Sequence, residues 1–118
     1  MNVYLFNRII DLICLGQGFI PSDLCIKSRN AEVVYCRQLI MYFARKNNVG
    51  TLSFISGKFY MDHSTVCYSM KVIMNWFDTD RDKRAAILSY SQKIKEWNKV
   101  EIIENKQDEI FMENDFTT

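Results

Sequence analysis

The fold is decided by one stretch, Leu52-Ser53-Phe54-Ile55-Ser56-Gly57-Lys58-Phe59-Tyr60-Met61-Asp62-His63-Ser64-Thr65-Val66. A short amphipathic segment is followed by a break at Tyr60-Met61 and by a second segment that opens on small polar residues. This order is typical of a helix-turn-helix unit. In such units the start of the second helix enters the major groove of DNA. The stretch therefore predicts a DNA-binding helix-turn-helix.

The polar residues that open the second segment suit the reading of base edges. They are Asp62, His63, Ser64 and Thr65. Aspartate can accept a hydrogen bond from a cytosine amino group, histidine can donate or accept, and a serine or a threonine methyl can meet a thymine methyl. A second interpretation stays open, in which Asp62 or Ser64 only caps the helix and His63 caps or packs.

The spacing of apolar residues predicts an all-α chain. The first helix runs from Tyr4 to a stop at Gly16 and Gly18, and residues 19–28 form an irregular link. Further helices are predicted at 30–47, 51–59, 63–77 and 80–99. In the helix over 63–77 the residues predicted to face the core are Val66, Met70, Ile73 and Met74. A capping box that begins at Thr79 is predicted to open the last helix.

Length and composition indicate one domain. The chain has 118 residues, of which 48% are hydrophobic, and a single proline with four glycines leaves little room for a turn-rich sheet. We expect an N-terminal accessory helix at 1–24, a helix-turn-helix domain at 25–99 and an acidic tail at 100–118. The first helix is best interpreted as a core helix, and dimerisation through it is the alternative.

The formal net charge of +1 hides an uneven distribution. One lysine against six acidic residues gives 100–118 a net charge of −5, so residues 1–99 carry +6. Seven cations against two acids give 27–71 a net charge of +5. A basic patch beside an acidic tail is compatible with a nucleic-acid partner. The tail is either a solvated segment that makes no contact with the domain or an autoinhibitory segment that folds against the basic patch.

Several classes of function find no support in the sequence. The four cysteines are too far apart for a CxxC pair and there is one histidine, so we expect no metal site and reduced thiols in a cytoplasmic protein. Cys36 and Cys67 fall in apolar helical patterns and are predicted to act as small hydrophobes. Asn7, Arg8 and Asp11 interrupt the apolar N-terminal stretch, which argues against a membrane span.

Catalysis is equally unsupported by the sequence. There is no acid–base pair, no nucleophile beside a base and no G-x-x-x-x-G-K-[ST] phosphate loop. We therefore expect no enzyme activity, no cofactor and no small-molecule substrate.

Residues 27–73 resemble the C-terminal DNA-binding domain of the bacterial chromosomal replication initiator family, DnaA. Lys27-Ser28-Arg29-Asn30 resembles its basic lead-in, and Arg37-Gln38-Leu39-Ile40-Met41-Tyr42-Phe43-Ala44-Arg45 resembles its long helix. Leu52-Ser53 and residues 55–59 resemble the first helix of its helix-turn-helix. The most specific match is residues 62–66, which resemble the family signature Asp-His-(Ser/Thr)-Thr-Val.

The resemblance implies a helix-turn-helix of the tryptophan-repressor class and assigns roles to particular residues. It implies base contacts in the major groove from Asp62, His63 and Ser64, with Thr65 close by. Arg37 matches the family arginine that enters the minor groove, although a solvated arginine is the alternative. The candidates for phosphate contacts, which give affinity without sequence choice, are Lys27, Arg29, Arg45, Lys58 and Lys71.

Two departures from the family pattern qualify this expectation. Met61 stands where the family usually has an arginine, and the chain has no ATPase phosphate loop. The leading hypothesis is sequence-specific binding of double-stranded DNA that regulates replication initiation or transcription, with avidity from homodimerisation. The alternative is a protein-interaction module that kept the fold and acts on replication machinery without binding DNA.

Overall fold

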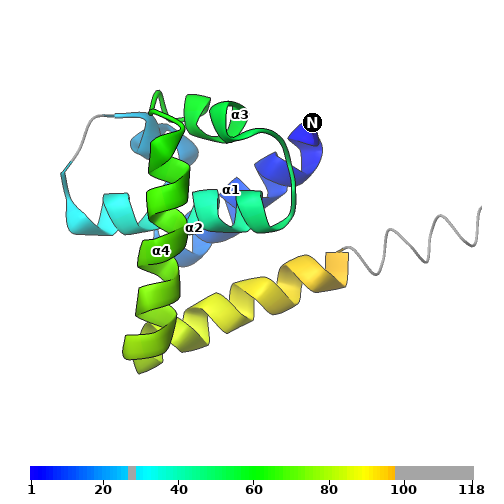
Figure 1. Ribbon diagram of the computed structural model, residues 1–118. Helices are drawn as coiled ribbons and strands as arrows, with labels where there is room; N and C mark the ends of the chain where they lie inside the picture. The colour runs from blue at the N-terminus through cyan, green and yellow to red at the C-terminus, as the bar shows by residue number, and fades with distance from the viewer. Residues whose placement is uncertain (27–28, 98–118) are drawn as a thin grey trace, which may run out of the picture.

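The computed structural model describes residues 1–26 and 29–97, and this part of the chain is all-α, as predicted. The elements are α1 (Val3–Gln17), the short 3-10 helix η1 (Pro21–Cys25), α2 (Ala31–Lys46), α3 (Leu52–Gly57) and α4 (Ser64–Thr79), and residues 81–97 form a last helix (Figure 1). The helix-turn-helix, α3 followed by α4, lies where the sequence placed it. The link over residues 19–28 was expected to be irregular, but it contains η1.

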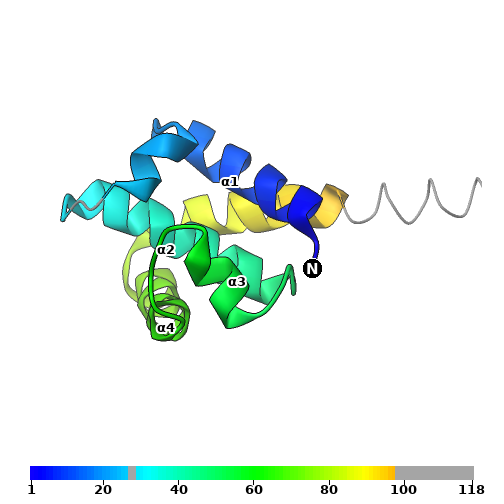
Figure 2. The same cartoon turned by 90° about the horizontal axis from the view of Figure 1, so that it is seen from above.

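Helix α2 is the centre of the fold. It lies between α1 and α4 and packs against both (Figure 2). Nearly its whole second half is buried, and the buried residues of α2 are Val33, Cys36, Arg37, Leu39, Ile40, Met41, Tyr42, Phe43 and Ala44. The burial of so much apolar surface on one helix fixes the position of every element that carries the site.

The first helix belongs to this same core. Asn2 caps α1 by accepting a hydrogen bond from the Leu5 backbone N–H at 3.0 Å, and Gly18 ends it with a left-handed φ of +82°. Its buried face shares one cluster with Leu24, α2 and α4. The prediction of a core helix is confirmed, and the expected boundary between residues 24 and 25 does not separate two cores. Leu5, Ile9 and Ile13 are buried within the chain, whereas Tyr4 and Leu15 of the same helix are exposed.

The inward stripe of α4 differs from the prediction in one position. Val66 and Ile73 are fully buried and Met70 is half-buried, but the Met74 side chain is 48% exposed. Ser69 is buried instead, and its hydroxyl donates a hydrogen bond to the Thr65 carbonyl at 2.7 Å. A buried hydroxyl that is satisfied by its own helix is tolerated in a core.

The turn from α4 into the last helix also differs from the prediction. Thr79 still belongs to α4, where its hydroxyl donates to the Asn75 carbonyl at 2.7 Å. The cap of the last helix is Asp80, whose Oδ1 accepts from the Lys83 backbone N–H at 3.0 Å. The Arg84 guanidinium donates to the carbonyls of Phe77 and Asp78, which end α4. The last helix then packs back on the core through Ile87, Tyr90 and Ile94.

The cysteines and the tail complete the comparison with the predictions. Cys14 and Cys36 are buried, but Cys67 is exposed, so its predicted role as a small core hydrophobe is wrong. The acidic tail at 100–118 lies outside the described residues. Across 1–26 and 29–97, none of the helices has the length and apolar character that a membrane crossing needs.

The contact between α1 and the last helix yields a prediction at Gly16. A Cβ atom at this position would collide with the buried ring and hydroxyl of Tyr90, whose hydroxyl also accepts from Gln17 Nε2 at 2.8 Å. Gly16→Ala should therefore lower the free energy of unfolding by about 1–3 kcal/mol, although alanine normally stabilises a helix. Urea unfolding followed by circular dichroism measures the change.

Gly57→Ala is the matched control, because nothing lies within 4 Å of a Cβ added at Gly57 in α3. Equal effects of the two substitutions would contradict the close packing of Gly16 against Tyr90.

Candidate nucleic-acid interface

Local hydrogen bonds and two buried anchors set the geometry of the helix-turn-helix. Thr51 caps α3, since its hydroxyl oxygen accepts from the Phe54 backbone N–H at 3.1 Å. The backbone N–H of Met61 donates to the Ser56 carbonyl at 3.1 Å and closes the turn. Ile55 and Val66, one on each helix, are fully buried in the core. The unit is therefore fixed from inside, and its outer face is left to solvent.

The start of α4 projects outward. The side chains of Asp62 and His63 are 68% and 64% exposed, Ser64 is exposed and Thr65 is half-buried. This tip, defined here as residues 62–65, stands at the end of α4 remote from the last helix (Figure 1). The structure thus brings the four predicted base-reading residues together, with Thr65 less accessible than the others.

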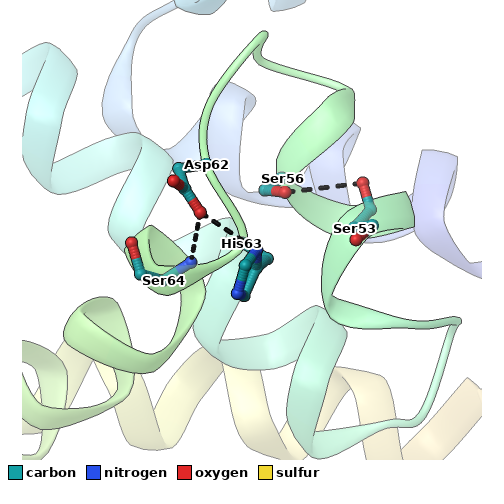
Figure 3. Close-up of polar contacts among 5 residues, drawn as sticks. All are labelled: Ser53, Ser56, Asp62, His63 and Ser64. Atoms are coloured by element: carbon teal, nitrogen blue, oxygen red, sulfur yellow. Dashed lines mark hydrogen bonds and ion pairs between the residues drawn. The ribbon is translucent and has the colours of Figure 1, made fainter.

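Asp62 organises the tip. Its Oδ1 accepts from the Ser64 backbone N–H at 3.1 Å and lies 3.0 Å from Nδ1 of His63 (Figure 3). The N–H of Ser64 lowers the pKa of the Asp62 carboxyl, and the positive charge of a protonated His63 lowers it further. Asp62 thus caps the first turn of α4 from the position before His63, which has helical φ and ψ and makes no side-chain cap of its own. This cap does not exclude base contact, because a carboxylate has about four acceptor positions.

The contact with Asp62 also orients His63. Nδ1 of His63 lies beside the carboxylate and Nε2 is the second ring nitrogen; an imidazole has one donor and one acceptor nitrogen when it is neutral. In the major groove the complementary donors are the amino groups of adenine and cytosine. The tip therefore presents acceptors from two adjacent side chains, together with the hydroxyl of Ser64, which can serve either way.

The predicted phosphate contacts are spread over the surface. Lys58 lies in the turn and Lys71 lies two helical turns beyond Ser64 on α4, and both are exposed. Arg29 and Arg45 are also exposed, but they flank opposite ends of α2, about 20 Å apart along its axis. Lys27 lies outside the described residues. Lys58 and Lys71 thus lie on the helix-turn-helix, Arg29 and Arg45 lie at opposite ends of α2, and the four cations do not converge on a single point.

Arg37 does not lie where the sequence predicted. Its side chain is 5% exposed, and Nη1 donates to the carbonyls of Leu24 at 3.3 Å and Ile26 at 3.1 Å. Burial lowers the pKa of its guanidinium. In this conformation Arg37 holds the end of η1 against α2 and presents no guanidinium to a minor groove. It is therefore left out of the candidate interface.

Three further residues complete the surface. Met61, at the position where an arginine was expected, is half-buried and packs against the core. Tyr60, in the turn, is 83% exposed and adopts a left-handed φ of +57°. Tyr68, on α4, is 62% exposed. The sequence prediction missed both tyrosines, although the spacing of four residues from Ser64 could have placed Tyr68 on the same face.

These features define a helix-turn-helix protein whose second helix begins with an exposed polar tip. The model of one family, the bacterial DnaA protein helix-turn-helix, matches residues 6–73. The chain belongs to this family, and the resemblance found in residues 27–73 is confirmed.

Individual relatives agree with this assignment. The chain is 34% identical over 90 residues to the chromosomal replication initiator protein DnaA of Desulfotalea psychrophila, covering 76% of this chain and 19% of that protein. It is 26% identical over 89 residues to the DnaA protein of Campylobacter jejuni, covering 75% of this chain and 20% of that protein. It is 31% identical over 87 residues to the DnaA protein of Tropheryma whipplei, covering 74% of this chain and 18% of that protein. The chain spans about a fifth of the length of these relatives.

The cap formed by Asp62 predicts a pH-dependent stability. Asp62→Ala should lower the melting temperature at pH 7, whereas Asp62→Asn should nearly preserve it, because asparagine also caps helices. Since the folded-state pKa of Asp62 is lowered, its stabilisation is present at neutral pH and is lost as the pH falls below the ordinary aspartate pKa of about 3.9. Thermal melts between pH 7 and pH 2.5 measure this effect. A difference between wild type and Asp62→Ala that stayed constant over this range would disprove the cap.

The burial of Arg37 predicts a structural role. Arg37→Met should lower the free energy of unfolding by about 2–4 kcal/mol, because the buried carbonyl of Leu24 and the partly buried carbonyl of Ile26 lose a charged donor. Arg45→Met, at an exposed position of the same helix, should change it by less than about 0.5 kcal/mol. Chemical denaturation of both variants measures the difference. If neither variant changed the stability, Arg37 would again be a candidate for contact with DNA.

Proposed function

We propose that this chain binds double-stranded DNA by placing the tip of α4 in the major groove. The observation that carries the proposal is the exposure of Asp62 and His63 at a helix start that their mutual contact orders. An ordered tip loses little conformational entropy on binding. Membership of the bacterial DnaA protein helix-turn-helix family supports the same function.

The proposed binding is sequence-specific, with a preference for amino groups in the major groove. Asp62 and His63 offer acceptors to cytosine and adenine, and Ser64 contributes a hydroxyl. Thr65, half-buried behind them, supports the tip and offers its methyl group at short range. These contacts select the site, and the exposed cations supply affinity that does not depend on the sequence.

The proposed biological role is the control of replication initiation or of transcription. The relatives are named chromosomal replication initiator proteins, and this chain matches a fifth of their length. The proposed activity is binding and needs no catalytic group. A module that acts on replication machinery through protein contacts is the second candidate, because Met61 replaces an expected cation with a packing contact.

Selection of bound sequences from a random duplex pool tests the proposal. Wild type should enrich one motif, and Asp62→Asn should change the preference at one or two positions while retaining the fold. The matched control is Arg45→Met, which should weaken binding to every sequence without changing the motif.

The salt dependence separates the two candidate functions. About four phosphate contacts predict that affinity falls on the order of a hundredfold between 50 and 200 mM salt. Fluorescence anisotropy with a labelled duplex measures this. Absent binding, or binding that is flat across this range, would favour the protein-interaction module.

A further inference from the structure

The outer face of α4 continues beyond the tip. Ser64, Cys67, Tyr68 and Lys71 are all exposed, and their spacing of three, four and seven residues places them on one face of the helix. Val66, Ser69 and Ile73 are buried on the other side. The face that begins at the tip therefore runs outward for two more turns.

The side chains on this face lengthen with distance from the tip. Ser64 is short, Tyr68 stands about 6 Å further along the axis and is long, and Lys71 follows. A helix that enters a groove by its N-terminal end moves away from the base edges along its length, so later positions need longer side chains to reach them. Zinc-finger helices likewise contact successive bases from residues three apart. Tyr68 therefore has the position and the side-chain length that contact with a base edge requires.

The chemistry of Tyr68 favours one particular group on DNA. Tyr68 is 62% exposed, and its hydroxyl, unlike a lysine or arginine side chain, brings no positive charge to a phosphate. The ring offers an apolar surface, and the methyl group of thymine is the apolar group that a base pair presents in the major groove. A ring against that methyl group removes apolar surface from water on both partners.

We propose that Tyr68 is a specificity-determining residue whose ring contacts the 5-methyl group of a thymine beside the base pairs read by residues 62–64. The proposal rests on the proposed DNA-binding function. It adds a base pair to the recognised site and assigns that base pair to a residue outside the family signature.

The first experiment compares motifs selected from a random duplex pool. Wild type and Tyr68→Phe should both prefer thymine at one position that flanks the positions altered by Asp62→Asn, and Tyr68→Ala should lose that preference alone. Leu88→Ala is the matched control, because Leu88 is an exposed apolar residue on the last helix and lies outside α4. Its motif should equal that of wild type.

The second experiment changes the DNA, and its wild-type arm gives a result even if Tyr68→Ala fails to fold. Deoxyuridine replaces the thymine of the selected duplex and removes only the methyl group. Wild type should bind this duplex about fourfold more weakly, as expected for one buried methyl group, whereas Tyr68→Ala should bind both duplexes equally.

The outcomes separate this inference from the DNA-binding function itself. A wild-type motif that Tyr68→Ala leaves intact, or deoxyuridine that leaves wild-type affinity unchanged, overturns the role of Tyr68 only. A uniform loss of affinity in Tyr68→Ala with no change of motif also overturns it, since that result indicates a backbone contact. Failure of wild type to enrich any motif overturns the proposed sequence-specific function and the role of Tyr68 with it.

Discussion

A single carboxylate oxygen organises the surface on which the proposed function depends. Oδ1 of Asp62 accepts from the Ser64 backbone N–H and contacts Nδ1 of His63, so it fixes the start of α4 and the orientation of the imidazole together. The first backbone N–H groups of a helix need partners, and here a residue that also faces solvent provides one. The same carboxylate therefore stabilises the start of α4 and holds the polar tip in place, so a substitution of Asp62 changes both.

The interior explains why the rest of the surface stays in place. Helix α2 buries nearly all its side chains from Cys36 to Ala44, and Arg37 is accepted within this run because the carbonyls of Leu24 and Ile26 satisfy its guanidinium. A charged group is tolerated in a core when its donors find acceptors. Arg37 thereby ties the segment before α2 to the body of the protein. The same family position can serve structure in the free protein even where sequence similarity suggests a role on DNA.

Local patterns predicted the elements well, and tertiary contacts decided what they could not. The helix-turn-helix and the bounds of α2 follow from runs of apolar residues and from local caps, which are encoded within a few residues. Met74 is exposed and Ser69 is buried, contrary to the predicted stripe. Helical spacing alone did not determine which side of α4 faces its neighbouring helix. Asp80 replaced Thr79 as the cap because α4 extends to Thr79. Tyr68 was missed because the family signature ends before it.

The two positions, Asp62 and Tyr68, differ in how freely they can vary. A substitution at Asp62 changes the helix cap as well as any contact with a base, so residues that cannot cap are disfavoured there whatever sequence they would read. Tyr68 lies on a solvated face in the interior of α4, and most residues with adequate helix propensity can replace it without a loss of core packing. On the proposed roles of these residues, changes of target sequence should therefore occur more readily at the position of Tyr68 than at the tip. The constraint is thermodynamic, since a residue with two roles loses both when it is replaced.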